Sequence, residues 1–335
     1  MASSELKPIV ASLLAKAGRK VNDLDMKHMV AGGNNRVFEV LVDGQRFVAK
    51  KYFYAASDRR DRLGTEFKFL SHIWEIGLRC VPEPLVYDDD SRVALYEFIE
   101  GRRLECREID ESFITETARF FAALNDVKSR TRGYQLSNAS EACFTVASHL
   151  DLVDCRLARL GAISPSTQLD REAIEFTRRL SQVWELKKAE IRERCDERWE
   201  LPGSWRCLSP SDFGFHNTLL RTDGKLCFLD FEYAGWDDPA KVMGDFFSHP
   251  GSPVPQKYYE AFLNTALAPF AEREALAERS RLLAPVFRVK WCCIILNEFL
   301  PEDARRRRFA DPTIGAEARK KEQLAKAWNH LEKLT

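Results

Sequence analysis

The pattern of apolar and polar positions divides the chain into a strand-rich first part and a helix-rich remainder. Short apolar runs separated by residues typical of turns predict three strands over residues 27–53 and a hairpin over 85–98. Residues 57–77 instead carry apolar side chains at helical spacing, which predicts one helix between these strands. We therefore expect an antiparallel sheet with one key helix within residues 1–98.

Residues 99–335 are predicted to form a larger, mainly helical part. Amphipathic or charged runs predict helices over 114–125, 143–160, 170–199, 239–247, 258–266, 272–299 and 317–334. One stretch, from Cys207 to Asp238, interrupts this pattern. It reads as a loop, a strand, a tight turn that ends at Gly224 and a second strand, because a Gly that follows Asp readily takes a positive φ. The pattern alone predicts an α+β fold.

Composition and charge narrow the class of protein. A length of 335 residues favours about two domains, since a domain usually has ~100–200 residues. Lys plus Arg and Asp plus Glu both number 51, so the net charge is zero. A general nucleic-acid-binding protein would normally be basic, so we expect no nucleic-acid partner.

Cysteine use and hydropathy favour a cytoplasmic protein. The nine cysteines include no C-x-x-C pair, and reduced thiols are the simplest interpretation of this pattern. We find neither a secretory signal peptide nor an apolar run near the ~20 residues that a membrane span needs. We therefore expect no membrane partner, and no feature of the sequence predicts the oligomeric state.

Three polar residues in the stretch from Cys207 to Asp238 suggest chemistry. Asp212 and Asn217 lie in its loop, and Asp230 follows its second strand, so the hairpin carries all three to one end. Phosphoryl transfer needs such a set, because a carboxylate orients the attacking hydroxyl while Asn and Asp hold magnesium on the triphosphate. A polar hairpin with a capped loop explains any one of these residues, but it explains the three in this order much less readily.

The spacing of these residues resembles that of a known family. Asp212 and Asn217 form a D-x-x-x-x-N motif, and the run DFEY begins at Asp230 one hairpin later. In both features the chain is similar to the aminoglycoside phosphotransferase and choline kinase-like family of small-molecule kinases. The DFEY run resembles the choline kinase version in particular. The chain has Pro210-Ser211 where that family usually has His-Gly before the catalytic Asp.

This resemblance implies a bilobal protein-kinase-like fold, in which residues 1–98 form the N-lobe and residues 99–335 form the C-lobe. It also implies that Asp212 is the catalytic base. Asn217 and Asp230 would be the ligands of Mg²⁺, and ATP would be the phosphoryl donor.

Features of the first hundred residues match a nucleotide-binding role. A turn that contains Gly32, Gly33, Asn34 and Asn35 can present backbone N–H groups to a phosphate. The run FVAK that ends at Lys50 resembles the strand that carries the phosphate-binding lysine of the kinase fold.

Lys51 is the rival of Lys50, but strand alternation places the two side chains on opposite faces, and we favour Lys50. Glu66 points along the buried side of the predicted helix over 57–77. A buried carboxylate needs a partner, so we expect Glu66 to pair with Lys50, as in the kinase fold. The segment from Glu97 to Ile99 resembles the hinge whose backbone groups bind adenine.

The residues after Asp230 are candidates for the acceptor wall. Glu232, Tyr233, Trp236 and Asp237 follow the metal ligand closely, so we expect them near the γ-phosphate. Carboxylates beside aromatic rings suit a cationic acceptor, which we favour slightly. The alternatives are that Glu232 braces the loop, that Trp236 belongs to the core, that Asp238 before Pro239 caps the next helix, and that a sugar hydroxyl uses the same carboxylates.

The sequence thus predicts an ATP-dependent phosphotransferase that acts on a hydroxyl of a small molecule. Choline or another amino alcohol, a sugar and an aminoglycoside all remain open as acceptors. A protein kinase-like enzyme is one alternative, but no A-P-E element follows Asp230 at the distance of an activation segment. A catalytically inactive nucleotide-binding pseudokinase is the other.

Overall fold

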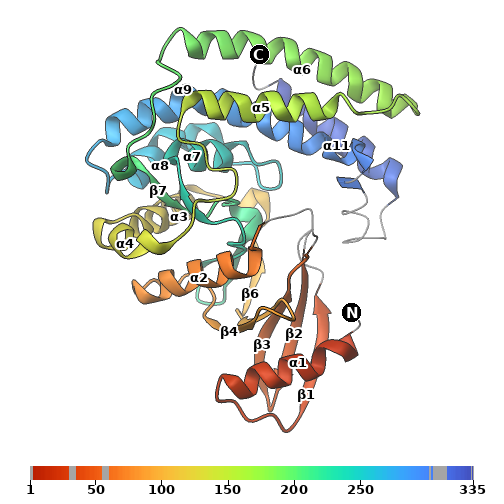
Figure 1. The fold of residues 1–335 in the computed structure, drawn as a ribbon, viewed down its shortest axis with the longest axis vertical. Helices are drawn as coiled ribbons and strands as arrows, with labels where there is room; N and C mark the ends of the chain where they lie inside the picture. Colours follow the sequence, from red (N-terminus) through yellow and green to blue (C-terminus); the bar gives the residue numbers. More distant parts are fainter. Residues whose placement is uncertain are drawn as a thin grey trace. The chain divides into compact units, whose positions relative to one another are not determined.

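The chain, in a computed structural model, is described over residues 3–29, 35–54, 60–301, 303–304, 315–332 and 334 (Figure 1). Packing divides it into two compact units, neither of which is continuous in sequence. The first unit contains Met1–Glu108, Asp126–Ser140 and Pro210–Gly235, and the second contains Ile109–Asn125, Glu141–Ser209 and Trp236–Thr335. The predicted division after residue 98 follows chain order, whereas these units follow packing. In particular, Pro210–Gly235 packs with the N-terminal strands.

The first unit contains a five-stranded antiparallel sheet in the order β1-β2-β3-β5-β4. Its strands are β1 (Leu24–Met29), β2 (Arg36–Val42), β3 (Gln45–Lys51), β4 (Pro84–Asp88) and β5 (Val93–Glu97). Asp43 and Gly44, with φ of 47° and 82°, form the predicted turn between β2 and β3. Positive φ at both positions is typical of a two-residue hairpin.

Helices α1 (Ser3–Lys16), α2 (Arg62–Glu75) and α4 (Val127–Arg132) also belong to the first unit. Figure 1 shows α1 beside strand β1, and its Leu6, Val10 and Leu13 are buried in the same core as the strands. The helix α2 begins where the Asp61 side chain accepts a hydrogen bond from the backbone N–H of Gly64 at 3.1 Å. Such capping satisfies an N–H group that has no partner within the helix.

A smaller sheet in the first unit carries the candidate catalytic segment. Its order is β6-β8-β9, with β6 (Gly101–Arg103), β8 (Thr218–Arg221) and β9 (Leu226–Phe228). Strands β8 and β9 and the turn at Gly224, where φ is 80°, agree with the predicted hairpin. The sequence pattern missed β6. This strand follows the predicted hinge and pairs with β8, so it places the hinge beside the catalytic segment.

The second unit is mainly helical. Its longer helices are α3 (Glu111–Leu124), α5 (Val146–Leu160), α6 (Gln168–Arg192), α7 (Pro239–Ser248), α8 (Tyr259–Ala266), α9 (Arg273–Ile295) and α11 (Ala316–Leu331). Figure 1 shows α5 and α6 lying along each other, and both contribute to a core that includes the fully buried Trp184. Pro285 lies inside α9 without ending it.

The predicted fold class is confirmed by an antiparallel sheet in the N-terminal part and a mainly helical remainder. Strands β7 (Cys207–Ser209) and β10 (Gly235–Asp237) flank the candidate catalytic segment and pair with each other. Among the described residues, we find no helix with the length and hydropathy of a membrane span.

Candidate active site

A cavity of about 500 Å³ in the first unit contains most of the predicted site residues. Its lining includes the following of them: Asn35, Lys50, Glu66, Glu97, Ile99, Asp212, Asn217 and Asp230. Gly32, Gly33 and Asn34 lie outside the described residues. Glu232, Tyr233, Trp236 and Asp237 are not part of this lining.

Lys50 connects two carboxylates that line the cavity with it. Its Nζ donates hydrogen bonds to Glu66 Oε2 at 2.6 Å and to Asp230 Oδ1 at 2.7 Å. The predicted ion pair of Lys50 and Glu66 is thus confirmed. Burial alone would lower the pKa of Lys50, but Asp230, Glu66 and Glu232 together raise it well above the ordinary value. The side chain of Lys51 instead donates to the backbone carbonyl of Ser91.

Two buried tyrosines, which the sequence did not single out, extend this network. The hydroxyl of Tyr52 donates to Glu66 Oε2 at 2.6 Å and lies 2.7 Å from the hydroxyl of Tyr96. The backbone N–H of Phe231 points toward Glu66 Oε1 at 3.4 Å. Glu66 therefore has three donors, Lys50 and Tyr52 at the end of β3 and Phe231 from the segment after β9, which fix its carboxylate. The sequence did contain a clue to Tyr52, because this residue lies two positions after Lys50 and strand alternation places both side chains on the same face.

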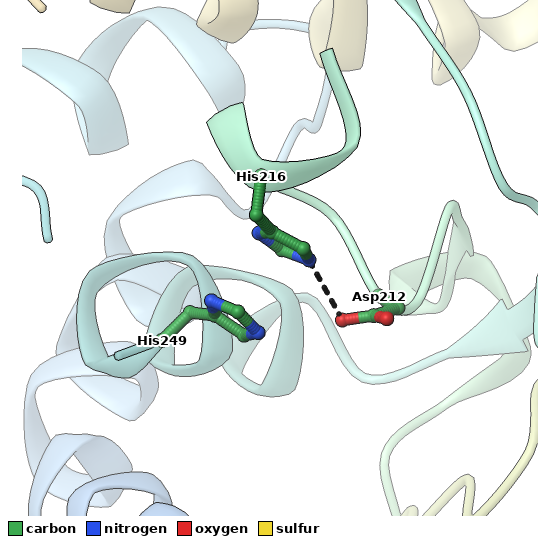
Figure 2. A group of neighbouring side chains, drawn as sticks. All are labelled: Asp212, His216 and His249. Carbon is green, nitrogen blue, oxygen red and sulfur yellow. Dashed lines mark hydrogen bonds and ion pairs between the residues drawn. The ribbon is translucent and has the colours of Figure 1, made fainter. Parts of the chain in front are cut away.

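Asp212 is held by its own loop. Ser211 before it has φ of 66°, a conformation that non-glycine residues adopt chiefly at constrained sites. Nε2 of His216 forms a hydrogen bond of 3.1 Å with Asp212 Oδ1 (Figure 2). The side chain of Asn217 donates to the backbone carbonyl of Asp212 at 2.9 Å. These contacts brace a loop that lacks the His-Gly of the resembled family.

His216 was also missed from the sequence. It lies four residues after Asp212, next to the predicted metal ligand, and a single 3₁₀ turn (Phe215–Asn217) brings its ring back to the carboxylate. The side chain of Arg103, on β6, donates to the carbonyl of His216 at 2.9 Å. A His four residues after an Asp is compatible with such a contact, but the spacing alone does not predict it.

Negative charge gathers around Asp230. Burial raises the pKa of Asp230, and the negative charges of Glu232 and Asp212 raise it as well. Lys50 lowers the pKa but does not outweigh these effects, so the pKa stays above the ordinary value. Among the described residues, four carboxylates (Glu66, Asp212, Asp230 and Glu232) gather here with two buried cations, Lys50 and Arg62.

Comparison with protein families identifies the chain. Residues 27–279, more than half of its length, match the model of the phosphotransferase enzyme family. The chain belongs to this family. The match confirms the enzyme class predicted from the sequence, an ATP-dependent small-molecule phosphotransferase. No curated protein sequence matches the phosphotransferase.

Solved structures of small-molecule kinases share the fold of this phosphotransferase. A choline kinase from Cryptosporidium parvum has a TM-score of 0.62 at 12% identity, covering 98% of this chain and 97% of that one. A choline/ethanolamine kinase family protein from Mesorhizobium loti has a TM-score of 0.62 at 16% identity, with coverage of 99% and 95%. A spectinomycin phosphotransferase, solved with ADP and spectinomycin, has a TM-score of 0.61 at 8% identity, covering 98% of each chain.

The predicted acceptor carboxylates of the phosphotransferase already have partners. Glu232 is 2% exposed and contacts Asn35 and Arg62. Asp237 is fully buried and forms an ion pair with Lys241. Tyr233 and Trp236 are partly exposed.

The neighbouring Asp238 caps the helix α7, as the alternative interpretation of the sequence expected. It accepts a hydrogen bond from the backbone N–H of Ala240 at 2.8 Å. It also bonds to His149 at 3.1 Å and to Arg279 at 2.7 Å.

Proposed function

We propose that this phosphotransferase moves the γ-phosphoryl group of ATP to a hydroxyl group of a small molecule. One observation carries the proposal. Lys50, Glu66, Asp212, Asn217 and Asp230 line one cavity, although up to 180 positions separate them in the sequence. Phosphoryl transfer depends mainly on positioning and on charge stabilisation, which this set of side chains can supply.

ATP would occupy the cavity with its base at the segment from Glu97 to Ile99. The side chains of Tyr96, Phe98 and Ile99 give this end of the lining aromatic and apolar surface suited to a purine. The phosphates would reach Lys50, whose ammonium is held in place by Glu66. The turn that contains Gly32, Gly33, Asn34 and Asn35 would provide further backbone donors.

The residues at the other end of the cavity fit Mg²⁺. Magnesium prefers oxygen ligands, and Asp230 and Asn217 supply a carboxylate and an amide oxygen. Because the amide nitrogen of Asn217 donates to the carbonyl of Asp212, its side-chain oxygen can serve as the ligand. The carboxylates of Asp212 and Asp230, which line this part of the cavity together, add negative charge that favours a divalent cation. When bound, Mg²⁺ would neutralise charge on the phosphates.

Asp212 would orient the acceptor hydroxyl and accept its proton. The hydrogen bond from His216 and the backbone contact of Asn217 hold the loop so that the carboxylate keeps one orientation. An oriented carboxylate brings the attacking oxygen in line with the phosphorus without a search through other conformations.

The acceptor is a hydroxylated molecule such as an amino alcohol, a sugar or an aminoglycoside. Tyr233 and Trp236 are the better candidates for its wall, because both are partly exposed. The carboxylates of Glu232 and Asp237 are paired with Arg62 and Lys241, which weakens the argument for a cationic acceptor.

A screen of acceptors tests this proposal. The enzyme is incubated with ATP and with choline, ethanolamine, neutral sugars or aminoglycosides, and ADP release is measured with Mg²⁺ and with excess chelator. We expect ADP release that needs both an acceptor and Mg²⁺. A wild-type enzyme that binds no Mg·ATP, or whose ADP release persists unchanged in Asp212→Ala, would contradict the proposed function.

A further inference from the structure

Glu232 lies buried between two segments that are far from it in sequence. Its Oε2 accepts a hydrogen bond from Asn35 Nδ2 at 2.5 Å, across 197 positions of the chain. Its Oε1 forms an ion pair with Arg62 Nη1 at 3.5 Å. The side chains of Glu232 and Arg62 are 1% and 2% exposed. Their ion pair is therefore buried, and breaking it is costly, unlike breaking an exposed ion pair on the surface.

Both the nitrogen and the oxygen of the Asn35 side-chain amide form hydrogen bonds. While its nitrogen donates to Glu232, its Oδ1 accepts a hydrogen bond from the backbone N–H of Phe53 at 3.1 Å. Asn35 directly precedes strand β2, and Phe53 follows β3 three positions after Lys50. Asn35 also lines the cavity with Lys50 and Asp230, whereas Glu232 does not. The amide thus connects Glu232 to the phosphate-binding end of the sheet.

Arg62 brings a third element to the same carboxylate. It is the first residue of α2, one helical turn before Glu66, the partner of Lys50. Its guanidinium also lies 5.4 Å from the centre of the Tyr233 ring. Because Glu232 follows Asp230 by two positions, one buried carboxylate connects the metal-binding segment, the start of α2 and the start of β2.

This arrangement disfavours a direct contact of Glu232 with the acceptor. Each oxygen of this carboxylate already has a partner inside the protein, Asn35 for Oε2 and Arg62 for Oε1. An ammonium group of an acceptor would have to displace these buried partners, which is costly.

We propose that Glu232 and Asn35 are positioning residues for the nucleotide. Their hydrogen bond holds Asn35, which directly precedes β2, against the segment that carries Asp230. The ion pair with Arg62 holds α2, and with it Glu66, in the same arrangement. This inference rests on the proposed function, because it assigns the two residues to the Mg·ATP side of that reaction.

Asn35→Ala is the most informative variant, because it removes the connection and leaves the buried pair of Glu232 and Arg62 intact. We expect the dissociation constant of Mg·ATP, measured by calorimetry without turnover, to rise about tenfold. The KM for Mg·ATP should rise with it, while the KM for the acceptor stays within about twofold. Asn22→Ala is the matched control, since Asn22 donates to the Asp43 carboxylate at 3.1 Å on the exposed edge of the same unit.

Glu232→Ala and the double variant complete the test, and thermal unfolding confirms that each variant is folded. Both substitutions break the same hydrogen bond. Adding Asn35→Ala to Glu232→Ala should therefore raise the dissociation constant of Mg·ATP by less than about a further twofold, the limit expected for a shared contact. Unchanged Mg·ATP binding in Asn35→Ala, or a raised acceptor KM with unchanged nucleotide binding in Glu232→Ala, would overturn this inference alone. Absence of Mg·ATP binding in the wild type would instead overturn the proposed function.

Discussion

Lys50 donates a hydrogen bond to Oδ1 of Asp230 at 2.7 Å, although 180 positions separate the two residues. The contact joins strand β3 to Asp230, the second residue after the end of strand β9. It places the proposed phosphate-binding cation, Lys50, against the proposed metal ligand, Asp230. A substitution of Lys50 should therefore affect both the phosphate site and the metal site.

Substitution of Lys50 is expected to impair both binding and turnover. Lys50→Met removes the cation from two buried carboxylates, so the KM for ATP should rise and kcat should fall by at least about tenfold, or about 1.4 kcal/mol. Lys51→Met is the matched control, because Lys51 points to the other side of the strand and bonds to Ser91. Steady-state kinetics of both variants test the choice. If Lys51→Met loses activity while Lys50→Met keeps normal activity, the assigned strand face is wrong.

Substitution of Asp212 is expected to separate chemistry from nucleotide binding. Asp212→Ala should reduce kcat by roughly 10³-fold, which corresponds to about 4 kcal/mol, while Mg·ATP binding stays within about twofold. Asp223→Ala is the control, since this Asp lies in the exposed turn between β8 and β9 and should leave kcat unchanged. Retention of more than about a tenth of the wild-type rate in Asp212→Ala would refute the assigned role.

Tyr52→Phe is expected to loosen Glu66. The substitution removes a hydrogen bond to a buried carboxylate and should destabilise the protein by about 1–3 kcal/mol in urea unfolding. The KM for ATP should also rise, because Glu66 positions Lys50. Tyr134→Phe provides the control, as Tyr134 is 74% exposed. Equal stability and equal KM for the two variants would show that the Tyr52 hydroxyl does not position Glu66.

The ion pairs of Asp238 predict a pH-dependent stability. Burial raises the pKa of Asp238, but His149 and Arg279 outweigh it and hold the pKa below the ordinary value. A lowered pKa in the folded state contributes stability that is present above about pH 4 and lost as the pH falls further. Asp238→Asn keeps a helix-capping side chain but removes the charge, so its effect on stability reports the ion pairs.

Urea unfolding of wild type and Asp238→Asn measures this contribution. At pH 7 the variant should be less stable by about 3 kcal/mol, since it breaks the buried ion pair with Arg279. Below pH 4 the difference should shrink, because the carboxyl of Asp238 is protonated in the unfolded chain before it is protonated in the folded protein. A difference that stays constant between pH 7 and pH 3 would contradict the assigned ionisation.

The sequence identified the residues whose role depends on local spacing. The D-x-x-x-x-N motif, the hairpin and Asp230 all lie in the one stretch from Asp212 to Asp230, so a role in phosphoryl transfer could be predicted for them without knowledge of the fold. The ion pair of Lys50 and Glu66 was also predictable, because a carboxylate on the buried side of a helix needs a cation.

Contacts between distant segments could not be predicted in the same way. Glu232 could be an acceptor ligand or a brace by sequence alone, and its burial against Asn35 and Arg62 supports the second interpretation. The hydroxyls of Tyr52 and Tyr96 and the ring of His216 likewise gain meaning only from their partners.

The physical reason is the range of each interaction. Turn chemistry, strand alternation and helical spacing act between neighbours in the chain, and the sequence by itself determined the fold class, the favoured lysine and the candidate catalytic motif. Burial and hydrogen bonding depend on which segments pack together, and only the tertiary structure decided that the acidic residues after Asp230 are paired within the protein.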